Sequence, residues 1–464
     1  MFSYKHLKDK LIRNLGATRL IVLSFVLVIL IGTILLSLPF AKNGIHVSFI
    51  DNLFTATSAT CVTGLMTVVA VDSYSLFGQL VILCLIQIGG LGLMSIVAVM
   101  ITLFKKKLAY REKTILRDAV NKIDVSDVGK FLIHIIKYTM LFEGIGMFLL
   151  SFEMIPTYGV LGGLYHALFL SVSAFCNAGI DLFGSSSLIQ YVHNPLVNYT
   201  VMFLIITGGL GFTVWIDLRA NLTEAIKQRW PFRKFFDHLL LHTKVVLVSS
   251  VFLLVSAFII IYTIEVLNPN TLGGLSLYDQ IQAAAFNATT LRTAGFSTIN
   301  YGLLNRATLL IMCIYMFIGG SPGGTAGGVK TTTVFVIVFY VMKKFRNNDH
   351  LTLMKREIQG AQVDKCFVIV LYSFFVAFCG IILLCLSQGH IELMDLIFEA
   401  FSAFGTVGLS TGITPMLNTV GKLIIIVLMF TGRVGAIALF VSLVRQSKKR
   451  INSVEYPKAE ILVG

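Results

Sequence analysis

Charged residues are scarce in this 464-residue chain, at 13% of the sequence, whereas a soluble domain carries roughly 25%. Hydrophobic residues make up 56%, and the mean hydropathy is +0.85. A chain with so little charge cannot cover a water-exposed surface in the usual way. The composition therefore excludes an ordinary soluble protein and places the chain in a lipid bilayer.

The sequence also lacks the patterns of a disulfide-linked or catalytic protein. Its seven cysteines show neither a disulfide framework nor the spacing of a zinc site, and lie at positions 61, 84, 176, 313, 366, 379 and 385. The apolar segments contain no metal-ligand cluster, nucleophile motif or paired carboxylates. These absences argue against a membrane enzyme.

Apolar runs are plentiful instead. Eight of them reach the roughly 20 residues that cross a bilayer as a helix, at about 19–39, 76–104, 131–155, 196–216, 245–267, 307–342, 366–388 and 420–444. The first run is too long for a signal peptide and ends at Pro39 without a small-residue cleavage site, so we expect it to be retained. The sequence thus predicts eight transmembrane helices.

Lysine and arginine gather in alternate loops. Of 37 such residues, 30 lie in the segments up to Arg19, 105–130, 219–244, 343–365 and from Arg445 onward, while the opposite loops hold only Lys42, Arg306 and Lys422. The positive-inside rule then predicts a multi-pass protein of the cell membrane with both termini in the cytoplasm. The net charge of +14 needs no nucleic acid, since a basic face beside anionic lipid explains it, and a docked soluble partner is compatible with that face.

One motif occurs four times. The segments FTATSATCVTGL (54–65), FLSVSAFCNAGI (169–180), AFNATTLRTAGF (285–296) and FEAFSAFGTVGL (398–409) align on Gly64, Gly179, Gly295 and Gly408, with Ser58, Ser173, Thr289 and Ser402 six residues earlier. The intervals are 115, 116 and 113 residues, so the repeat fills the chain. We predict four tandem units, 1–104, 105–218, 219–342 and 343–464.

Each motif ends a short apolar segment between two spans. A segment of 10 to 15 residues cannot cross a bilayer, so we expect a re-entrant helix. Asp51 and Asp395 lie thirteen residues before their glycines, where an acidic N-cap would suit the positive helix end, and His166 and Gln282 take that place in the other units. The predicted fold is an all-α polytopic membrane protein with a pseudo-fourfold pore.

The four glycines predict a cation path. Non-helical backbone at membrane depth is tolerated only where it lines water or is buried in protein. Four helix C-termini with partial negative charge, and carbonyls turned by glycines at positive φ, would attract a cation. The alternative is that each glycine only ends a helix or allows close packing. Four copies in register favour the pore.

The second span of each unit carries small residues, GGLG at 89–92, GGLG at 208–211, GGSPGG at 319–324 and GRVG at 432–435. Three copies suit close helix packing. The third widens into a Gly, Pro, Ser and Thr stretch from Gly319 to Gly328 that is expected to break its helix. The nearby match to a phosphate-binding loop is rejected, because Val329 interrupts it and apolar spans flank it.

Together, CVTG (61–64), CNAG (176–179), RTAG (292–295), GTVG (405–408), GGSPGGTAGGVKTTT (319–333) and TGRVG (431–435) resemble the Trk/Ktr/HKT superfamily of potassium transporters. Within it, the length and the tail VEYPKAEILVG are most similar to the membrane subunits of Ktr systems, the KtrB type. The resemblance implies units built as helix, pore helix and filter loop, and helix (M1–P–M2). It further implies a homodimer with one pore per protomer, K⁺ as the transported ion, and a KtrA-type cytoplasmic ring through which alone a nucleotide (ATP or ADP) would act. Sodium dependence is left open.

Carried over residue by residue, the resemblance implies two sites. The first is a potassium filter of Thr60, Cys61, Val62, Thr63, Gly64, Cys176, Asn177, Ala178, Gly179, Arg292, Thr293, Ala294, Gly295, Gly405, Thr406, Val407 and Gly408. The second is a gate in an intramembrane loop, 317–330, with Gly319, Gly320, Ser321, Gly323, Gly324, Thr325, Gly327, Gly328 and Lys330, together with Arg433.

Only the last glycine is common to all four motifs, so we expect irregular upper carbonyl rings and a weaker preference for potassium over sodium. Arg292 is expected to point behind the filter and bond backbone carbonyls, the alternative being a charge that lowers ion occupancy. Lys137 is expected to snorkel to the cytoplasmic side, and Glu143 has no assigned partner.

Arg433 needs a strong partner or a function at membrane depth, and bare carbonyls of 319–328 would suit its five donors. Lys330 either helps to hold this loop or snorkels to the inner surface. A packing and topology role for Arg433 is the alternative to a gate. For the whole chain, a channel-like subunit competes with an alternating-access carrier for another monovalent cation and with a membrane enzyme. Four units in one orientation favour the channel, because carriers commonly show inverted repeats.

Overall fold

The computed structural model describes residues 17–92, 128–346, 352–354 and 356–435. In that part of the chain the regular structure is helical apart from one antiparallel hairpin, β1 (Thr352–Leu353) with β2 (Arg356–Glu357). The basic segment 105–130 and both terminal segments lie largely outside the described residues.

The helices occur as successive sets in which a short helix stands between two longer or broken ones. They are α2 (Ala17–Ser37), α3 (Phe49–Cys61), α4 (Ala70–Ser73) and α5 (Leu76–Leu91); α8 (Val128–Cys176), α9 (Pro195–Leu210), α10 (Phe212–Gln228) and α11 (Phe232–His238); α12 (Leu241–Glu265), α13 (Leu277–Thr290), α14 (Arg306–Phe317) and α15 (Thr331–Phe345); and α16 (Gly360–Ser387), α17 (Leu393–Gly405) and α18 (Thr419–Val434). Four 3-10 turns lie in the connections, η1 (Pro39–Ala41), η2 (Ile189–Tyr191), η3 (Tyr301–Leu303) and η4 (Thr414–Met416).

A short helix leads into each glycine motif. These helices are α3, the last part of α8, α13 and α17. α8 runs on from its long first part without a gap, but its backbone breaks at Gly159, where φ is 74°, shortly after Pro156. Glycine accepts this conformation at little cost, so the chain can turn there between a long helix and a short one.

The predicted acidic N-caps are wrong in detail. Ser48 caps α3, because its hydroxyl accepts a hydrogen bond from the backbone N–H of Asp51, the third helical residue. In α17 the capping position is occupied by Glu392, and Asp395 is again the third residue. The carboxylates still lie at the positive end of each helix.

Three helices of the described chain are long and apolar enough to cross a membrane, in α8, α12 and α16, and the bent pair α9 and α10 would make a fourth. Three shorter apolar helices lie at Ile21–Ser37, Leu76–Leu91 and Arg306–Phe317. The predicted runs 76–104 and 420–444 continue beyond the described residues. The count of eight spans therefore stays a prediction.

Three of the second-span helices end at a glycine, although a helix break was expected only in the third unit. α5, α9 and α18 stop at Gly92, Gly211 and Gly435, whose φ angles are 79°, 95° and 92°. After Gly211 the chain continues as α10 at 94° to α9. The sequence predicted a helix break only in the third unit, because the glycine pairs elsewhere suited packing. A glycine at positive φ ends a helix as well.

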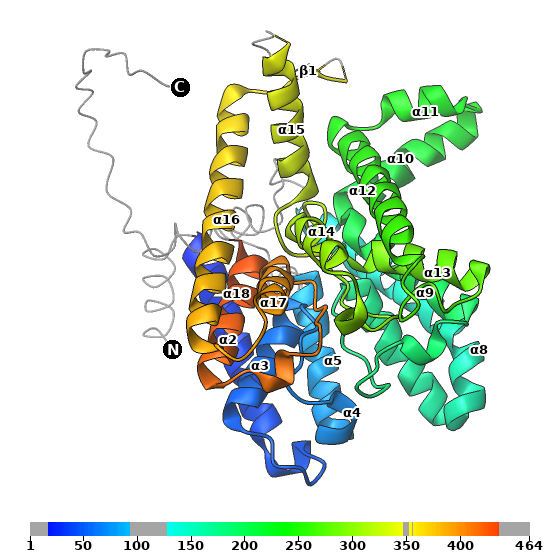
Figure 1. Ribbon diagram of the computed structural model, residues 1–464. Coiled ribbons are helices and arrows are strands. Elements are labelled where there is room, and N and C mark those ends of the chain that lie inside the picture. The colour runs from blue at the N-terminus through cyan, green and yellow to red at the C-terminus, as the bar shows by residue number, and fades with distance from the viewer. Residues whose placement is uncertain (1–16, 93–127, 347–351, 355, 436–464) are drawn as a thin grey trace, which may run out of the picture.

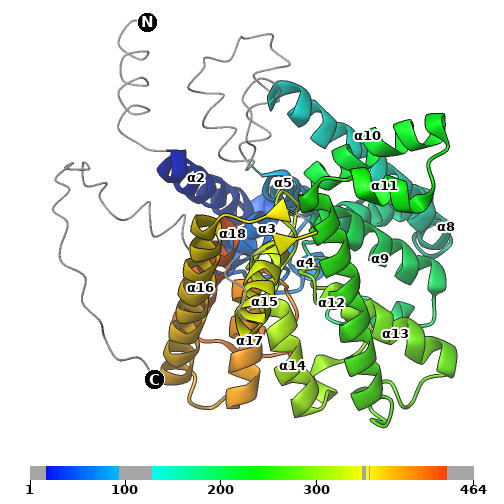
Figure 2. The ribbon, with the colours of Figure 1, turned by 90° about the horizontal axis from the view of Figure 1, so that it is seen from above.

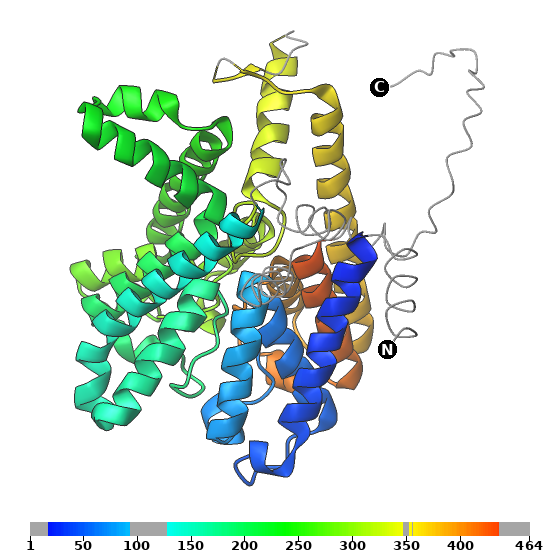
Figure 3. The same ribbon diagram turned by 180° about the vertical axis from the view of Figure 1, so that it is seen from behind.

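The units follow one another around a common centre, which Figure 2 shows as a progression of colour around the molecule. Each short helix packs on the second-span helix of the preceding unit, α8 on α5, α13 on α9, α17 on α14 and α3 on α18. The last contact closes the circle between the first and fourth units. Figures 1 and 3 show α10, α11 and the β-hairpin at one end of the molecule and α4 at the other. The described parts of the basic segments 219–244 and 343–365 thus lie at the same end.

Apolar side chains are exposed on the outside of the molecule, and many polar side chains are buried inside it. Large apolar side chains such as Phe252, Leu371 and Phe375 are exposed on outer helices, whereas serine, threonine and asparagine side chains are buried along the short helices. Monomeric soluble proteins rarely expose apolar surface on this scale. The exposed apolar faces suit contact with lipid.

Candidate functional site

The four motif glycines meet in a ring. An added Cβ at Gly64 would lie 2.7 Å from the carbonyl oxygen of Ala178, the residue before the next glycine. The same relation holds for Gly179 with Ala294 at 2.6 Å, for Gly295 with Val407 at 2.7 Å, and at still closer range for Gly408 with Thr63. Each unit therefore touches the next, and the fourth touches the first. We call these four glycines the glycine ring.

All four glycines have the backbone conformation expected of them. Their φ angles are 104°, 65°, 80° and 89° for Gly64, Gly179, Gly295 and Gly408. This left-handed region is accessible to glycine but strained for other residues. Glycine is needed here for a second reason as well, because a side chain would collide with the neighbouring unit.

A second set of left-handed residues stands two positions before the ring, and sequence reasoning missed it. Val62, Asn177, Thr293 and Thr406 have φ of 56°, 60°, 68° and 52°. A positive φ is a genuine outlier for β-branched residues. Their side chains differ, so residue identity carries no signal of the shared conformation. The backbone paths of the four motifs are thus more alike than their sequences.

Backbone bonds fix three motifs to their helices in one pattern. The residue before the glycine donates its N–H to the carbonyl six residues before that glycine, at 2.7 to 2.8 Å, for Thr63 to Ser58, Ala178 to Ser173 and Val407 to Ser402. In the third motif Ala294 donates to Thr290 at 3.0 Å, one residue closer. The third unit therefore has a tighter turn.

Oxygen atoms without donors gather at the ring. Among the described residues, no N–H or O–H group donates to the carbonyl oxygens of Thr63, Ala178, Ala294 and Val407. Three buried side-chain oxygens nearby also lack a partner there, Thr63 Oγ1, Thr406 Oγ1 and Asn177 Oδ1. Buried carbonyls are normally paired. Unpaired oxygens that converge from four units are suited to a cation that exchanges its water for them.

Arg292 differs from the expectation. Its side chain is buried, but Nε and Nη2 have no hydrogen-bond partner among the described residues, so the predicted bonds to backbone carbonyls are not found for these two atoms. Its own carbonyl instead accepts a bond of 3.2 Å from Asn177 Nδ2. The backbone of Arg292 thus contributes one of the contacts between the second and third motifs.

Glycines of the second spans pack against the short helices. An added Cβ at Gly89, Gly208 or Gly432 would collide with the carbonyl oxygen four residues before the motif glycine of the same unit, that of Thr60, Phe175 or Phe404. The close-packing interpretation of these three small-residue motifs is confirmed. The third unit departs from it, because Gly319 lies against Gly327 of its own loop.

The loop between α14 and α15 folds back on itself and contacts the second unit. Gly319 N–H donates to Val329 at 2.8 Å, which closes the loop. Thr325 donates from its backbone to Gly208 at 3.2 Å and from its hydroxyl to the carbonyl of Phe175 at 3.1 Å. The predicted helix break is confirmed, and neighbouring units satisfy part of the freed backbone.

The same loop lies against the fourth motif. An added Cβ at Gly327 would meet the side chain of Thr406, and one at Gly328 would lie 3.1 Å from the carbonyl oxygen of Gly405. Thr406 stands two residues before Gly408 in the ring. The loop therefore lies directly beside the glycine ring.

Arg433 joins three units. Its Nη1 donates to the carbonyl of Thr325 in the loop, and its Nη2 to the carbonyl of Gly89 at the end of α5, with Gly90 at 3.4 Å. The expected bond to the loop is confirmed. The bond to α5 was not foreseen, because nothing in the sequence relates residues so far apart. Lys330 Nζ donates to Ala326 at 2.8 Å, so it holds the loop and does not extend to the surface.

Glu143 is part of a small buried cluster. Gln87 Nε2 donates to its carboxylate at 3.2 Å, and Cys176 Sγ lies 3.9 Å from the other carboxylate oxygen. The cluster lies behind the second motif, since Gly90 would place a Cβ on Cys176. Lys137, one helical turn or more away, is exposed.

Comparisons with known proteins agree along the whole chain. The sequence model of the TrkH family, described as cation transport protein, matches residues 5–452. The chain is 37% identical over 459 residues to the Ktr system potassium uptake protein B of Bacillus subtilis, covering 98% of this chain and 99% of that protein. It is 36% identical to the potassium/sodium uptake protein NtpJ of Enterococcus hirae, covering 99% of each.

A solved structure agrees in fold. The crystal structure of the potassium transporter TrkH from Vibrio parahaemolyticus matches with a TM-score of 0.67 and 17% identity, over 91% of this chain and 84% of that one. At this identity the match speaks for the fold alone. The family model and the sequence relatives are described as transport proteins, in agreement with the sequence-based argument against an enzyme.

Proposed function

This chain belongs to the TrkH family of cation transport proteins, and we propose that it is the ion-translocating subunit of a Ktr-type potassium uptake system. The observation that carries the proposal is the glycine ring. Four glycines at positive φ bring together four carbonyls, one from each unit, that accept no hydrogen bond from any residue the structure describes. Such a ring can replace part of the hydration shell of a cation.

Potassium is the proposed cargo. The ring itself indicates a cation without naming it, and the relatives that match over nearly their full length are named as potassium uptake proteins. The name of NtpJ includes sodium, so sodium is retained as a second cargo or as an ion on which uptake depends. The filter residues proposed from the motif resemblance are the seventeen named above, with the ring at their centre.

The gate is proposed to be the loop 317–330 with Arg433. Support comes from the position of the loop beside Thr406 and from the bonds of Arg433 to Thr325 and Gly89. A guanidinium fixed close to the ring would repel a passing cation. Movement of this loop would then be needed for conduction.

The partners and the location follow from the same proposal. A protein named as part of a Ktr system implies a further subunit, and we propose a cytoplasmic nucleotide-binding ring of the KtrA type. The basic end formed by α10, α11 and the β-hairpin (Figure 1) is where it would dock. We also propose a homodimer in the cell membrane, with eight spans and both termini in the cytoplasm.

The direct test is rescue of growth. Cells that lack potassium uptake systems should grow at low external potassium when they express this chain with its partner, and purified complex in proteoliposomes should take up Rb⁺ in competition with K⁺. Absence of both effects for correctly inserted protein would refute the proposal. An alternating-access carrier would differ by saturating at low turnover, whereas a channel-like path follows the ion gradient at high flux.

A further inference from the structure

Four polar contacts join the units in a circle near the start of the short helices. Each contact runs from a residue in the first turn of a second-span helix, or just before that helix, to the short helix of the next unit around the circle. The pairs are Gln79 with Tyr165, His193 with Asp279, Arg306 with Glu392, and Lys422 with Asp51. We call these contacts the four joints. Three of them pair a lysine, an arginine or a histidine of one unit with a carboxylate at the start of the short helix of the next unit around the circle.

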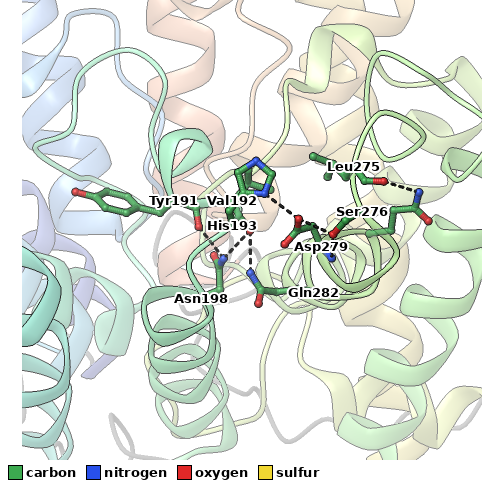
Figure 4. A network of polar contacts seen from close by, with 9 residues as sticks. Tyr191, Val192, His193, Asn198, Leu275, Ser276, Asp279 and Gln282 are labelled. Carbon is green, nitrogen blue, oxygen red and sulfur yellow. Dashed lines mark hydrogen bonds and ion pairs between the residues drawn. The ribbon is translucent and has the colours of Figure 1, made fainter.

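Figure 4 shows the joint between the second and third units. His193 Nδ1 lies 2.8 Å from Asp279 Oδ2, and Gln282 donates to the carbonyl of Val192 at 2.8 Å. The same carbonyl accepts a bond from Asn198 of α9. The start of α13 is thus tied to the connection before α9. This joint links units that are also neighbours in the chain.

The joint of Lys422 with Asp51 is different in kind. It connects residues 371 positions apart, at 2.7 Å between Nζ and Oδ1, and it closes the circle where no covalent link exists. The two side chains are only 16% and 14% exposed, whereas those of Arg306 and Glu392 are 57% and 63% exposed. Exposed ion pairs contribute little, because water and salt screen them. We therefore expect the pair of Lys422 and Asp51 to contribute more to holding its two helices together than the exposed pair of Arg306 and Glu392 does.

The position of Lys422 is explained by its partner and not by its own helix. It lies in the first turn of α18, whose N-cap is Asn418, and a cation is disfavoured at a helix N-terminus. Asp51 lies in the first turn of α3 and also accepts a bond of 2.6 Å from the hydroxyl of Ser48. The carboxylate thus offsets the positive ends of two helices and the lysine charge.

A short path leads from this joint to the glycine ring. α3 runs from Phe49 to Cys61, and Ser58 on it accepts a bond of 3.0 Å from the N–H of Gly64. At the ring, Gly408 of the fourth unit lies against the carbonyl of Thr63. The first and fourth units therefore meet at both ends of α3. A shift of α3 relative to α18 would displace Thr63 from Gly408.

We propose that Lys422 and Asp51 are positioning residues for the glycine ring, which hold α3 so that the spacing of the ring discriminates between potassium and sodium. This rests on the proposed function, since it assigns a determinant of ion discrimination at the same site. The lysine acts through α3 and touches no ion. Loss of either partner removes the ion pair that ties the start of α3 to the start of α18.

The experiment measures Rb⁺ uptake into proteoliposomes with Na⁺ as competitor, for the intact chain with its partner and for K422Q, D51N and the double variant. R306Q is the matched control, because it removes a cation from an exposed joint of the same topology. Uptake is divided by the amount of inserted protein. We expect each single variant to weaken discrimination against Na⁺ by at least about threefold, the double variant to be no worse than the worse single, and R306Q to match the wild type.

Three results would overturn the inference. They are unchanged discrimination in both single variants, losses that simply add in the double variant, and a fall in uptake that only follows the amount of inserted protein. If the wild type itself failed to take up Rb⁺, the proposed function would fail instead, so the two failures can be told apart.

Discussion

Gly408 packs against the backbone carbonyl of Thr63, so the last unit of the chain touches the first at the glycine ring. The contact is possible only because Gly408 has no side chain. It also places two unpaired carbonyls, those of Thr63 and Val407, within one small space. Such a space is suited to a cation, because a positive charge offsets the mutual repulsion of the oxygens.

Replacement of Gly408 by serine should therefore impair uptake or weaken discrimination against sodium while insertion stays normal. The matched control is Gly412→Ser. Gly412 has φ of 100° but nothing within 4 Å of an added Cβ, so it shares the strain of roughly 1–2 kcal/mol without the collision. A displaced carbonyl that weakens ion binding by about 1.4 kcal/mol lowers apparent affinity about tenfold. Uptake kinetics of G408S equal to those of G412S would contradict the assignment.

The sequence predicted structural features correctly at positions where the backbone conformation requires a particular residue type. The four motif glycines and the broken stretch 319–328 were recognisable because only glycine meets the backbone demand at those places. The bond of Arg433 to the loop followed from the cost of an unpaired guanidinium. These predictions needed no knowledge of which units are neighbours.

Other features depend on packing between distant segments and were not predictable. Val62 and Thr293 are held at positive φ by the structure around them, against their own preference. Glu143 finds Gln87 on another unit, and Lys422 finds Asp51 across the whole chain. No local pattern encodes such partners. These partners are determined by which units are neighbours around the circle, and that order is known only from the three-dimensional structure.

The pair of Lys422 and Asp51 predicts a pH dependence of stability. Burial acts to raise the pKa of Asp51, but hydrogen bonds from Lys422, Ser48 and Thr67, with the charge of Lys422, outweigh it and lower the pKa below its usual 3.8. A carboxyl group with a lowered folded-state pKa stabilises the fold above its unfolded-state pKa. That contribution is lost as the pH falls through the lowered value.

The melting temperature of purified Asp51→Asn should consequently lie below that of the wild type at neutral pH, and the difference should shrink below about pH 4. Asp72→Asn is the control, since Asp72 is an exposed carboxylate on the nearby helix α4. It should change the melting temperature little at any pH. A difference for Asp51→Asn that stayed constant down to pH 3 would show that the charge of Asp51 is not its source.

The basic end of the molecule predicts a partner. α10 and α11 carry exposed cations such as Arg219, Arg229 and Arg233, and the described chain has no folded domain at that end that could bind a nucleotide. Co-expression with a KtrA-type subunit and purification in mild detergent should recover a complex whose uptake responds to ATP and ADP. Charge reversal of Arg229 and Arg233 should weaken this complex more in low salt than in high salt, because salt screens the charges of exposed residues. Full nucleotide control by the chain alone would contradict the prediction.

The contact of Arg433 with Thr325 and Gly89 predicts the behaviour of the gate. Arg433→Ala removes both bonds and the charge, so it should raise ion flux and weaken control by the partner, as should deletion of part of 321–327. Lysine at position 433 should act almost like alanine on control, because one ammonium head is a point charge and lacks the planar fork that reaches two carbonyls. Thr325→Val is the matched control. It loses the hydroxyl bond to Phe175 but keeps the carbonyl that Arg433 uses.

Flux per inserted protein decides between a gate and an anchor. If Arg433 closes the path, flux rises in R433A and stays near the wild type in T325V. If Arg433 only anchors the packing of α5, α18 and the loop, flux falls in proportion to lost protein and control by the partner is unchanged. The two outcomes differ in sign, because removal of a blocking charge lowers the barrier to a cation whereas removal of an anchor only reduces the number of folded molecules.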